Sequence, residues 1–372
     1  MEEQQNQVKE RKFNVDFIRT VAIILVLFLH TSGRWLITSY ELNQFTLSEF
    51  LGWTIVDIYQ SIGVIGTPLF VLVSGALLLK PGKTESLSIF FKKRWNRIGG
   101  PFFFWSAIYF VWVFAVLNKP FSIEAVVQGL LNGPYTQFWY IYVLVGLYLW
   151  TPILRIFLNH ADRNHIKYFI ILWFIGASLI PLFDLLTIFQ IHRHVFTVTG
   201  FVGYFVLGSY LTTVKIRVST VFKLLLAGIA LTAIGTYLMA ATGGGQEMYF
   251  FQEYLSPTVI LSVSMVFLLL LQVKSPSVHN QNGSSNLNKL VTLIGQNTLA
   301  LYLIHVLILE SFQNGYFFFA INRDTLNPIV EVPVLTVLVL FVSLAIILLL
   351  KKIPYLNKLI GCTLDSKDKN KK

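Results

Sequence analysis

The chain has 372 residues, of which 55% are hydrophobic and only 13% are charged, about half the charged fraction of an average soluble protein. Apolar runs of about 20 residues recur along its whole length, as in proteins that lie in a lipid bilayer. This composition disfavours a soluble enzyme, a nucleic-acid-binding protein and a disordered scaffold. The single cysteine, Cys362, excludes a disulfide framework, and no Cys/His pair has zinc-ligand spacing, so we expect no metal site.

The apolar runs predict an all-α, polytopic integral membrane protein with about ten transmembrane helices. The expected spans lie near residues 15–36, 58–79, 97–117, 137–157, 167–183, 199–214, 221–241, 256–273, 291–312 and 330–350. This pattern divides the chain into a leader over 1–14, a ten-helix transmembrane domain over 15–350 and a basic tail over 351–372. The first span is about 20 residues long and no small-residue cleavage site follows it, so we expect it to remain as an anchor.

The net charge of +11 is distributed unevenly between the loops. Of the 29 basic residues, 25 lie at the termini and in every second loop, including Arg19 near the start of the first span. The other four are Arg34, Lys119, Arg193 and Arg323. By the positive-inside rule, this pattern predicts a multi-pass protein of the cell membrane with both termini in the cytoplasm. Topology accounts for the positive charge, so we expect membrane lipids and no nucleic acid as partners.

The first span contains two ionisable residues, Arg19 and His30. Such groups cost roughly 2.5–3.5 kcal/mol near the bilayer centre on insertion scales, and they persist where they are partnered or functional. Their separation of 11 residues places them on one helix face, about 16 Å apart along the axis, together with Ile23, Val26 and Arg34. In the alternative structural interpretation, Arg19 reaches the headgroups or pairs with Asp16, and His30 bonds a neighbouring carbonyl.

A basic run precedes the third span and contains Lys92, Lys93, Arg94 and Arg97. The three-residue spacing of Arg94 and Arg97 puts both on one helix face, which favours a shared ligand. The alternative is that the run is only the positive-inside signal and contacts anionic lipids.

The ninth span contains a second histidine, His305. It shares a face with Thr298 and Tyr302, so the three form a polar stripe that could line a cavity. A core histidine whose hydrogen bonds are satisfied by a neighbouring carbonyl or tyrosine is an equally good interpretation. We therefore rank His30 first and His305 second as candidate catalytic residues.

The string VDFIRTVAIILVLFLH in the first span, with its Arg-x10-His spacing, resembles the signature of the membrane-bound acyltransferase family 3. Bacterial members of that family O-acylate cell-surface carbohydrates. Similar strings follow in order, so the resemblance covers approximately residues 13–350: TPLFVLVSGALLL, KKRWNRIGGPF, FWYIYVLVGLYLWTPIL, GFVGYFVLGSYL and IGQNTLALYLIHVLIL. The string FWYIYVLVGLYLWTP is most similar to the branch that contains the O-acetyltransferase of enterobacterial common antigen.

The resemblance implies an O-acyltransferase that moves an acyl group, expected to be acetyl, from cytosolic acyl-CoA to a hydroxyl of a cell-envelope polysaccharide or lipid-linked glycan. The donor carries several phosphates, which Arg19, Lys93, Arg94 and Arg97 would bind from the cytoplasmic side. His30 would act either as the general base or as a covalent acyl carrier, because imidazole transfers protons near neutral pH.

The rival interpretation is a transporter, for example a flippase for a lipid-linked sugar or a carrier of a small solute. Arg19 and His30 would then be substrate or proton-relay sites. The strings quoted above and the lack of a visible inverted repeat argue against it.

Overall fold

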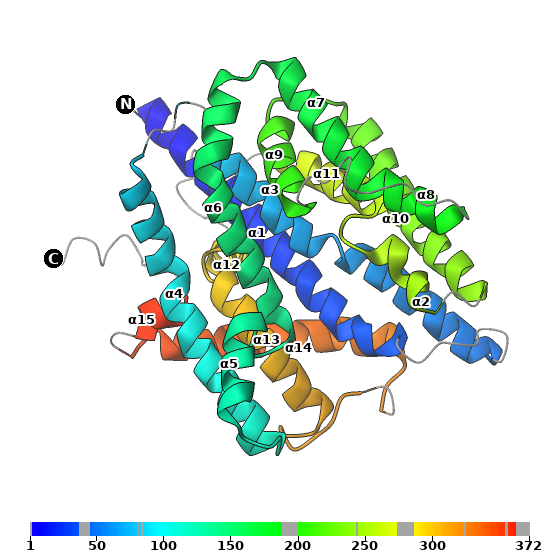
Figure 1. The fold of residues 1–372 in the computed structure, drawn as a ribbon. Coiled ribbons are helices and arrows are strands. Elements are labelled where there is room, and N and C mark those ends of the chain that lie inside the picture. Colours follow the sequence, from blue (N-terminus) through cyan, green and yellow to red (C-terminus); the bar gives the residue numbers. More distant parts are fainter. Residues whose placement is uncertain are drawn as a thin grey trace. The chain divides into compact units, whose positions relative to one another are not determined.

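The computed structural model describes residues 2–36, 45–80, 82, 85–187, 200–242, 245–273, 286–322, 325–353 and 356–361. Every regular element in these ranges is a helix, which confirms the expected all-α class (Figure 1). Cys362, Arg193 and Arg323 lie outside them, as does most of the expected basic tail. The expected boundaries after residues 14 and 350 stay predictions.

The chain divides into two compact units. Unit 1 comprises Met1–Lys83, Ile153–Gly295 and Ile321–Thr336, and unit 2 comprises Thr84–Pro152, Gln296–Ala320 and Val337–Lys372. The helices of unit 1 are α1 (Glu2–Leu36), α2 (Leu47–Gly63), α3 (Gly66–Leu78), α7 (Arg163–Phe174), η4 (Ile175–Leu179), α8 (Ile180–Leu186), α9 (Gly200–Leu211), α10 (Val218–Ala241), η6 (Gly245–Gln252), α11 (Pro257–Leu271) and α12 (Asn286–Gln296). Those of unit 2 are α4 (Leu87–Val111), η2 (Trp112–Val116), α5 (Ile123–Asn132), η3 (Thr136–Phe138), α13 (Thr298–Gln313) and α15 (Leu356–Leu359). Helix α12 has its last residue, Gln296, in unit 2, and two further helices have residues in both units, α6 (Trp139–His160) and α14 (Pro328–Leu350).

Eight helical segments in the described part of the chain are long and apolar enough to cross a membrane, or nine if α12 and α13 together form one broken span. The remaining expected span corresponds to α9, a shorter apolar helix. All ten apolar runs therefore form helices, whereas the count of ten spans and the cytoplasmic position of the termini stay predictions.

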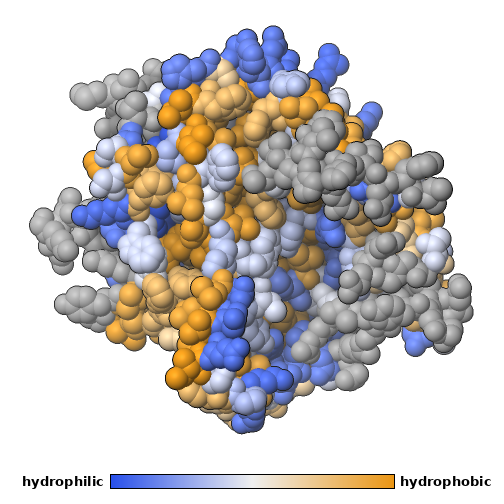
Figure 2. Space-filling view, viewed as in Figure 1, coloured by the Kyte–Doolittle hydropathy of each residue, from blue (hydrophilic) through white to orange (hydrophobic). Residues whose placement is uncertain are grey.

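Many large apolar side chains lie on the outside of these helices. Examples along α10 are Phe222, Leu226, Leu231 and Ile234, all of which are exposed. Figure 2 shows apolar side chains, in orange, over much of the visible face. A water-exposed surface of this kind would favour aggregation, but it suits contact with lipid tails.

Glycines allow the helices of unit 1 to pack with their backbones in close contact. A Cβ atom on Gly75 of α3 would lie 1.9 Å from the carbonyl oxygen of Phe205 in α9. Conversely, a Cβ atom on Gly208 of α9 would lie 2.1 Å from the carbonyl oxygen of Leu72. Small residues are the usual contact residues where helices meet in membranes, since apolar side chains gain nothing by leaving lipid.

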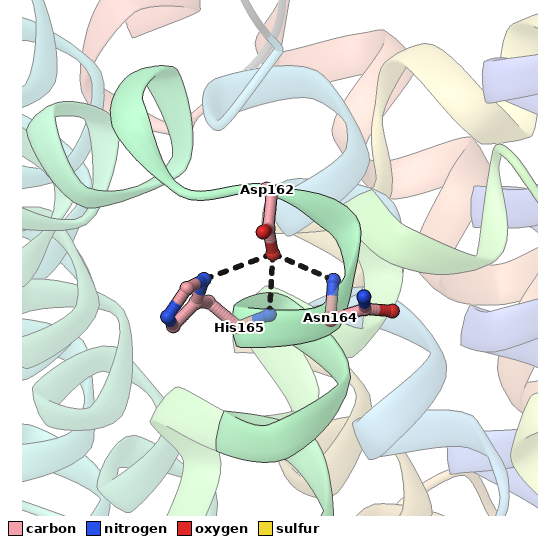
Figure 3. Close-up of polar contacts among 3 residues, drawn as sticks. All are labelled: Asp162, Asn164 and His165. Carbon is pink, nitrogen blue, oxygen red and sulfur yellow. Dashed lines mark hydrogen bonds and ion pairs between the residues drawn. The ribbon is translucent and has the colours of Figure 1, made fainter.

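The start of α7 is fixed by a cap from Asp162, which Figure 3 shows in close-up. Its Oδ1 accepts hydrogen bonds from the backbone N–H groups of Asn164 (2.9 Å) and His165 (2.8 Å), and it lies 2.9 Å from the His165 ring Nδ1. These contacts, led by the backbone N–H of His165, hold the pKa of Asp162 below its usual value.

Candidate active site

Helix α1 is continuous from Glu2 to Leu36, so Arg19 and His30 belong to one unbroken helix. The 11 residues between them correspond to about 16 Å along its axis. Ile23 and Val26, on the same stripe, are completely buried, while Arg19 and His30 are partly buried. The stripe thus faces other helices of unit 1, and α1 contacts α2, α3 and α11 (Figure 1).

The Arg19 end of α1 is held against α12. The Thr20 hydroxyl donates a hydrogen bond to the carbonyl oxygen of Val291 (2.8 Å), and Gly295 approaches the backbone of Asp16 too closely to accept a Cβ atom. Nη1 of Arg19 lies 3.8 Å from Oδ1 of the buried Asp16. This contact supports the structural interpretation of Arg19 as the ion-pair partner of Asp16.

The His30 end of α1 borders a pocket in unit 1. The pocket has a volume of about 410 Å³, and the residues that line it include Leu29, Gln60, Val64, Phe201, Gln252 and Tyr254. Nε2 of Gln252 donates a hydrogen bond to Oδ1 of the buried Asp57 (2.7 Å). Sequence analysis did not identify this pocket; the available signal was the pair of polar residues Asp57 and Gln60, three positions apart in an apolar helix.

The basic run lies at the start of α4 in unit 2. The Arg94 guanidinium lies over the Phe90 ring, 4.7 Å from its centroid, and 5.7 Å from that of Tyr148. Lys93 is exposed and its Nζ lies 2.5 Å from a carboxylate oxygen of Glu85. Arg97 is exposed as well. Of these residues Arg94 is the best oriented, because two aromatic rings hold its planar group.

His305 is completely buried in unit 2. Its Nδ1 lies 2.6 Å from the carbonyl oxygen of Tyr302, three residues earlier in the same helix. The Tyr302 hydroxyl donates to the carbonyl oxygen of Gln137 (2.8 Å), and Nε2 of Gln137 donates to that of Leu303 (3.1 Å). These bonds match the interpretation of His305 as a core histidine, and the predicted stripe is part of the helix packing.

Glu310 forms a second polar cluster in unit 2 that sequence analysis missed. Its carboxylate accepts hydrogen bonds from the Tyr135 hydroxyl (2.5 and 2.7 Å) and from Nε1 of Trp112 (3.0 Å). The ring of Tyr135 is stacked on that of Tyr109, with centroids 5.0 Å apart. In the sequence, Glu310 is visible only as a single acidic residue at the end of an apolar run. Its partners come from distant segments, η2 and the residues before η3.

Comparison with known proteins identifies the family. The family model described as "Acyltransferase domain", that of acyltransferase family 3, matches residues 12–348, nearly the whole chain. The chain belongs to this family. It is therefore a membrane acyltransferase, and a transporter is not favoured. No curated protein and no solved structure matches the chain. The branch within the family and the roles of the six candidate site residues stay predictions.

Proposed function

We propose that the protein transfers an acyl group, in the simplest case acetyl, from cytosolic acyl-CoA to a hydroxyl of a cell-envelope polysaccharide or its lipid-linked precursor. The observation that carries this proposal is the acyltransferase match over residues 12–348, together with Arg19 and His30 on one stripe of a continuous apolar helix. A cytosolic donor and an acceptor on the other side of the membrane require groups at two depths, and α1 supplies them.

In this proposal, arginines hold the phosphates of the donor. Arg94 and Arg97, three residues apart on α4, present guanidinium groups that can each bind two phosphate oxygens, and Arg19 does so on α1. Lys93 contributes positive charge beside Glu85. The extended pantetheine arm of the donor is similar in length to the distance of roughly 16 Å between Arg19 and His30 along the helix axis. It would bring the thioester to His30.

His30 then serves the chemical step in one of two ways. As a general base, its imidazole takes the proton of the acceptor hydroxyl while the oxygen attacks the thioester carbonyl, the carbon–sulfur bond breaks, and the CoA thiolate finally receives the proton. As a nucleophile, the imidazole itself takes the acyl group, releases CoA, and passes the group to the hydroxyl. Both routes need an imidazole nitrogen at this position.

The test uses purified protein with acetyl-CoA that is radiolabelled in the acetyl group, and total lipids and glycans of the source cells. We expect label in glycolipid or polysaccharide, released by mild alkali as acetate, because O-esters are alkali-labile. Acetyl-CoA labelled in its adenine serves as the control and should leave no label. If the glycan fraction remains unlabelled while other acyl-CoA chain lengths also fail, the proposed activity is wrong.

A further inference from the structure

The pocket beside α1 combines apolar and polar walls. Phe201 and Tyr254 form one aromatic wall, with ring centroids 6.1 Å apart, and Tyr249 lies at the same pocket. Gln60, Gln252 and Glu253 supply amide and carboxylate groups. A volume of about 410 Å³ falls in the range of pockets that bind small molecules, and a few polar groups in a mainly apolar pocket typically fix the orientation of a ligand.

The side chain of Gln60 has no hydrogen-bond partner among the residues that the structure describes. Its residue is only 7% exposed, it lines the pocket, and no residue in the described parts of the chain forms a hydrogen bond with its side chain. Its amide lines the pocket, so a ligand there can exchange hydrogen bonds with it.

Gln252 supplies a second amide group that is available to a ligand. Its Nε2 donates a hydrogen bond to Oδ1 of Asp57. Its Oε1 is buried and has no partner among the described residues. Gln252 can therefore accept a hydrogen bond from a ligand hydroxyl, and Gln60 can both donate and accept.

The pocket reaches the helix turn that carries His30. Leu29, the preceding residue, is part of its lining. His30 is the next residue along α1, one Cα step of about 3.8 Å away, although its own side chain is not among those that line the pocket. Gly63 brings α2 onto α1 at this point, since a Cβ atom there would lie 2.8 Å from the backbone nitrogen of Leu29.

We propose that this pocket is the acceptor site and binds one uncharged sugar unit of the glycan, an inference that rests on the proposed function. Aromatic rings pack on the C–H faces of a sugar, while amides and carboxylates bond its hydroxyls. The Glu253 carboxylate disfavours acidic sugars and phosphates by charge repulsion, so the occupant is a neutral sugar with neighbouring hydroxyls. Gln60 and Gln252 are the residues that select it.

The first test compares Gln60→Leu and Gln252→Leu with Gln272→Leu, a matched control at the C-terminal end of α11, outside the pocket. For both pocket variants we expect kcat/KM for the glycan acceptor to fall at least tenfold, with unchanged acetyl-CoA affinity. Gln60→Leu should also melt at the same temperature as wild type or higher, since it breaks no hydrogen bond to the described residues. A Gln60→Leu variant with wild-type kcat/KM overturns the assignment.

The second test does not depend on acyl transfer. In a Cys362→Ser background, Glu253→Cys is labelled with a maleimide in the presence of the glycolipid extract of the source cells, either untreated or oxidised with periodate. Periodate destroys neighbouring hydroxyls, so only the untreated extract should slow labelling. Equal protection by both extracts, or no protection, overturns the sugar site. Periodate-sensitive protection in a protein without transfer activity retains the sugar site and rejects the proposed acyltransferase function.

Discussion

The two histidines that sequence analysis proposed differ in their surroundings. His305 lies inside unit 2 with its Nδ1 bonded to a carbonyl of its own helix, a contact that restrains the ring. His30 is partly buried and follows a residue that lines a pocket. A reacting imidazole needs access to both substrates, so His30 is the better candidate.

Substitution of His30 separates a chemical role from a structural one. We expect both His30→Ala and His30→Gln to reduce turnover by about 10²–10⁴-fold, the usual loss of general base catalysis, or more if an acyl-imidazole forms. Glutamine can retain a structural hydrogen bond, whose loss costs about 1 kcal/mol, less than tenfold in rate. Acetyl-CoA turnover and binding should be measured on the same preparations. Turnover above about a tenth of wild type in the glutamine variant would make His30 structural.

Lysine substitutions test the donor site, because lysine keeps the charge but cannot form the planar two-point contact. We expect Arg94→Lys and Arg97→Lys to weaken acetyl-CoA binding by calorimetry, and Arg19→Lys to do the same. Arg163→Lys is the matched control, since Arg163 also lies over an aromatic ring, 5.8 Å from the Tyr210 centroid. If all four variants bind acetyl-CoA as tightly as wild type does, Arg19, Arg94 and Arg97 only anchor the chain to the membrane surface.

The Asp162 cap makes a pH-dependent contribution to stability. Because its pKa is lowered in the folded protein, the cap stabilises at pH values above the unfolded pKa of about 3.9 and loses this effect as the pH falls through the folded value. Asp162→Ala should therefore melt below wild type at pH 7, and this difference should shrink as the pH falls below about 3.9. Asp162→Asn keeps an acceptor that does not titrate and is the control. If the difference in melting temperature between wild type and Asp162→Ala does not change with pH, this account is wrong.

Charged candidates could be found from the sequence, but their uncharged neighbours could not. Arg19 and His30 stand out because ionisable residues are rare in an apolar run, and Arg94 belongs to a basic run. The pairing of Arg19 with Asp16 follows from helix spacing. Gln60 and Gln252 carry no charge and lie far apart in the sequence, so only packing brings them to one pocket.

Among the elements, hydropathy predicted every long apolar helix but not all their limits. The second expected span began at residue 58, whereas α2 begins at Leu47, where Thr46 and Glu49 form a capping box that hydropathy does not detect. The break at Asn297 between α12 and α13 lies inside the expected ninth span. Helix α5 was not expected, because its 10 residues are too few to cross a bilayer.

The contact between α3 and α9 should tolerate no added methyl group. Gly75→Ala and Gly208→Ala each place a Cβ atom within about 2 Å of a backbone oxygen, so we expect a loss of about 1–3 kcal/mol in stability. Gly146→Ala is the control: no atom lies within 4 Å of its Cβ position, and alanine favours a helix by up to about 1 kcal/mol. Melting in detergent measures all three. Similar melting temperatures in all three variants would show that α3 and α9 can move apart without loss of stability.

For the whole molecule, the distribution of basic residues makes a topology prediction. Reporters fused after residue 45, 125 or 250 should be extracytoplasmic, and those after 85, 280 or 365 should be cytoplasmic. An alkaline phosphatase and a fluorescent protein, which are active on opposite sides, provide the two readouts. A cytoplasmic signal at 250 would mean that the number of spans between residues 167 and 241 is even, whereas we expect three.

The reciprocal glycine contact also constrains how the chain is assembled in the membrane. Gly75 and Gly208 are separated by 208 − 75 = 133 residues, so α3 leaves the ribosome long before its partner exists. At synthesis rates of about 5–20 residues per second, this interval is roughly 7–27 s. During it the glycine face of α3 is open to lipid or to the insertion machinery, while α4 to α8 are made. Unit 1 can therefore be completed only after much of unit 2 has already been inserted.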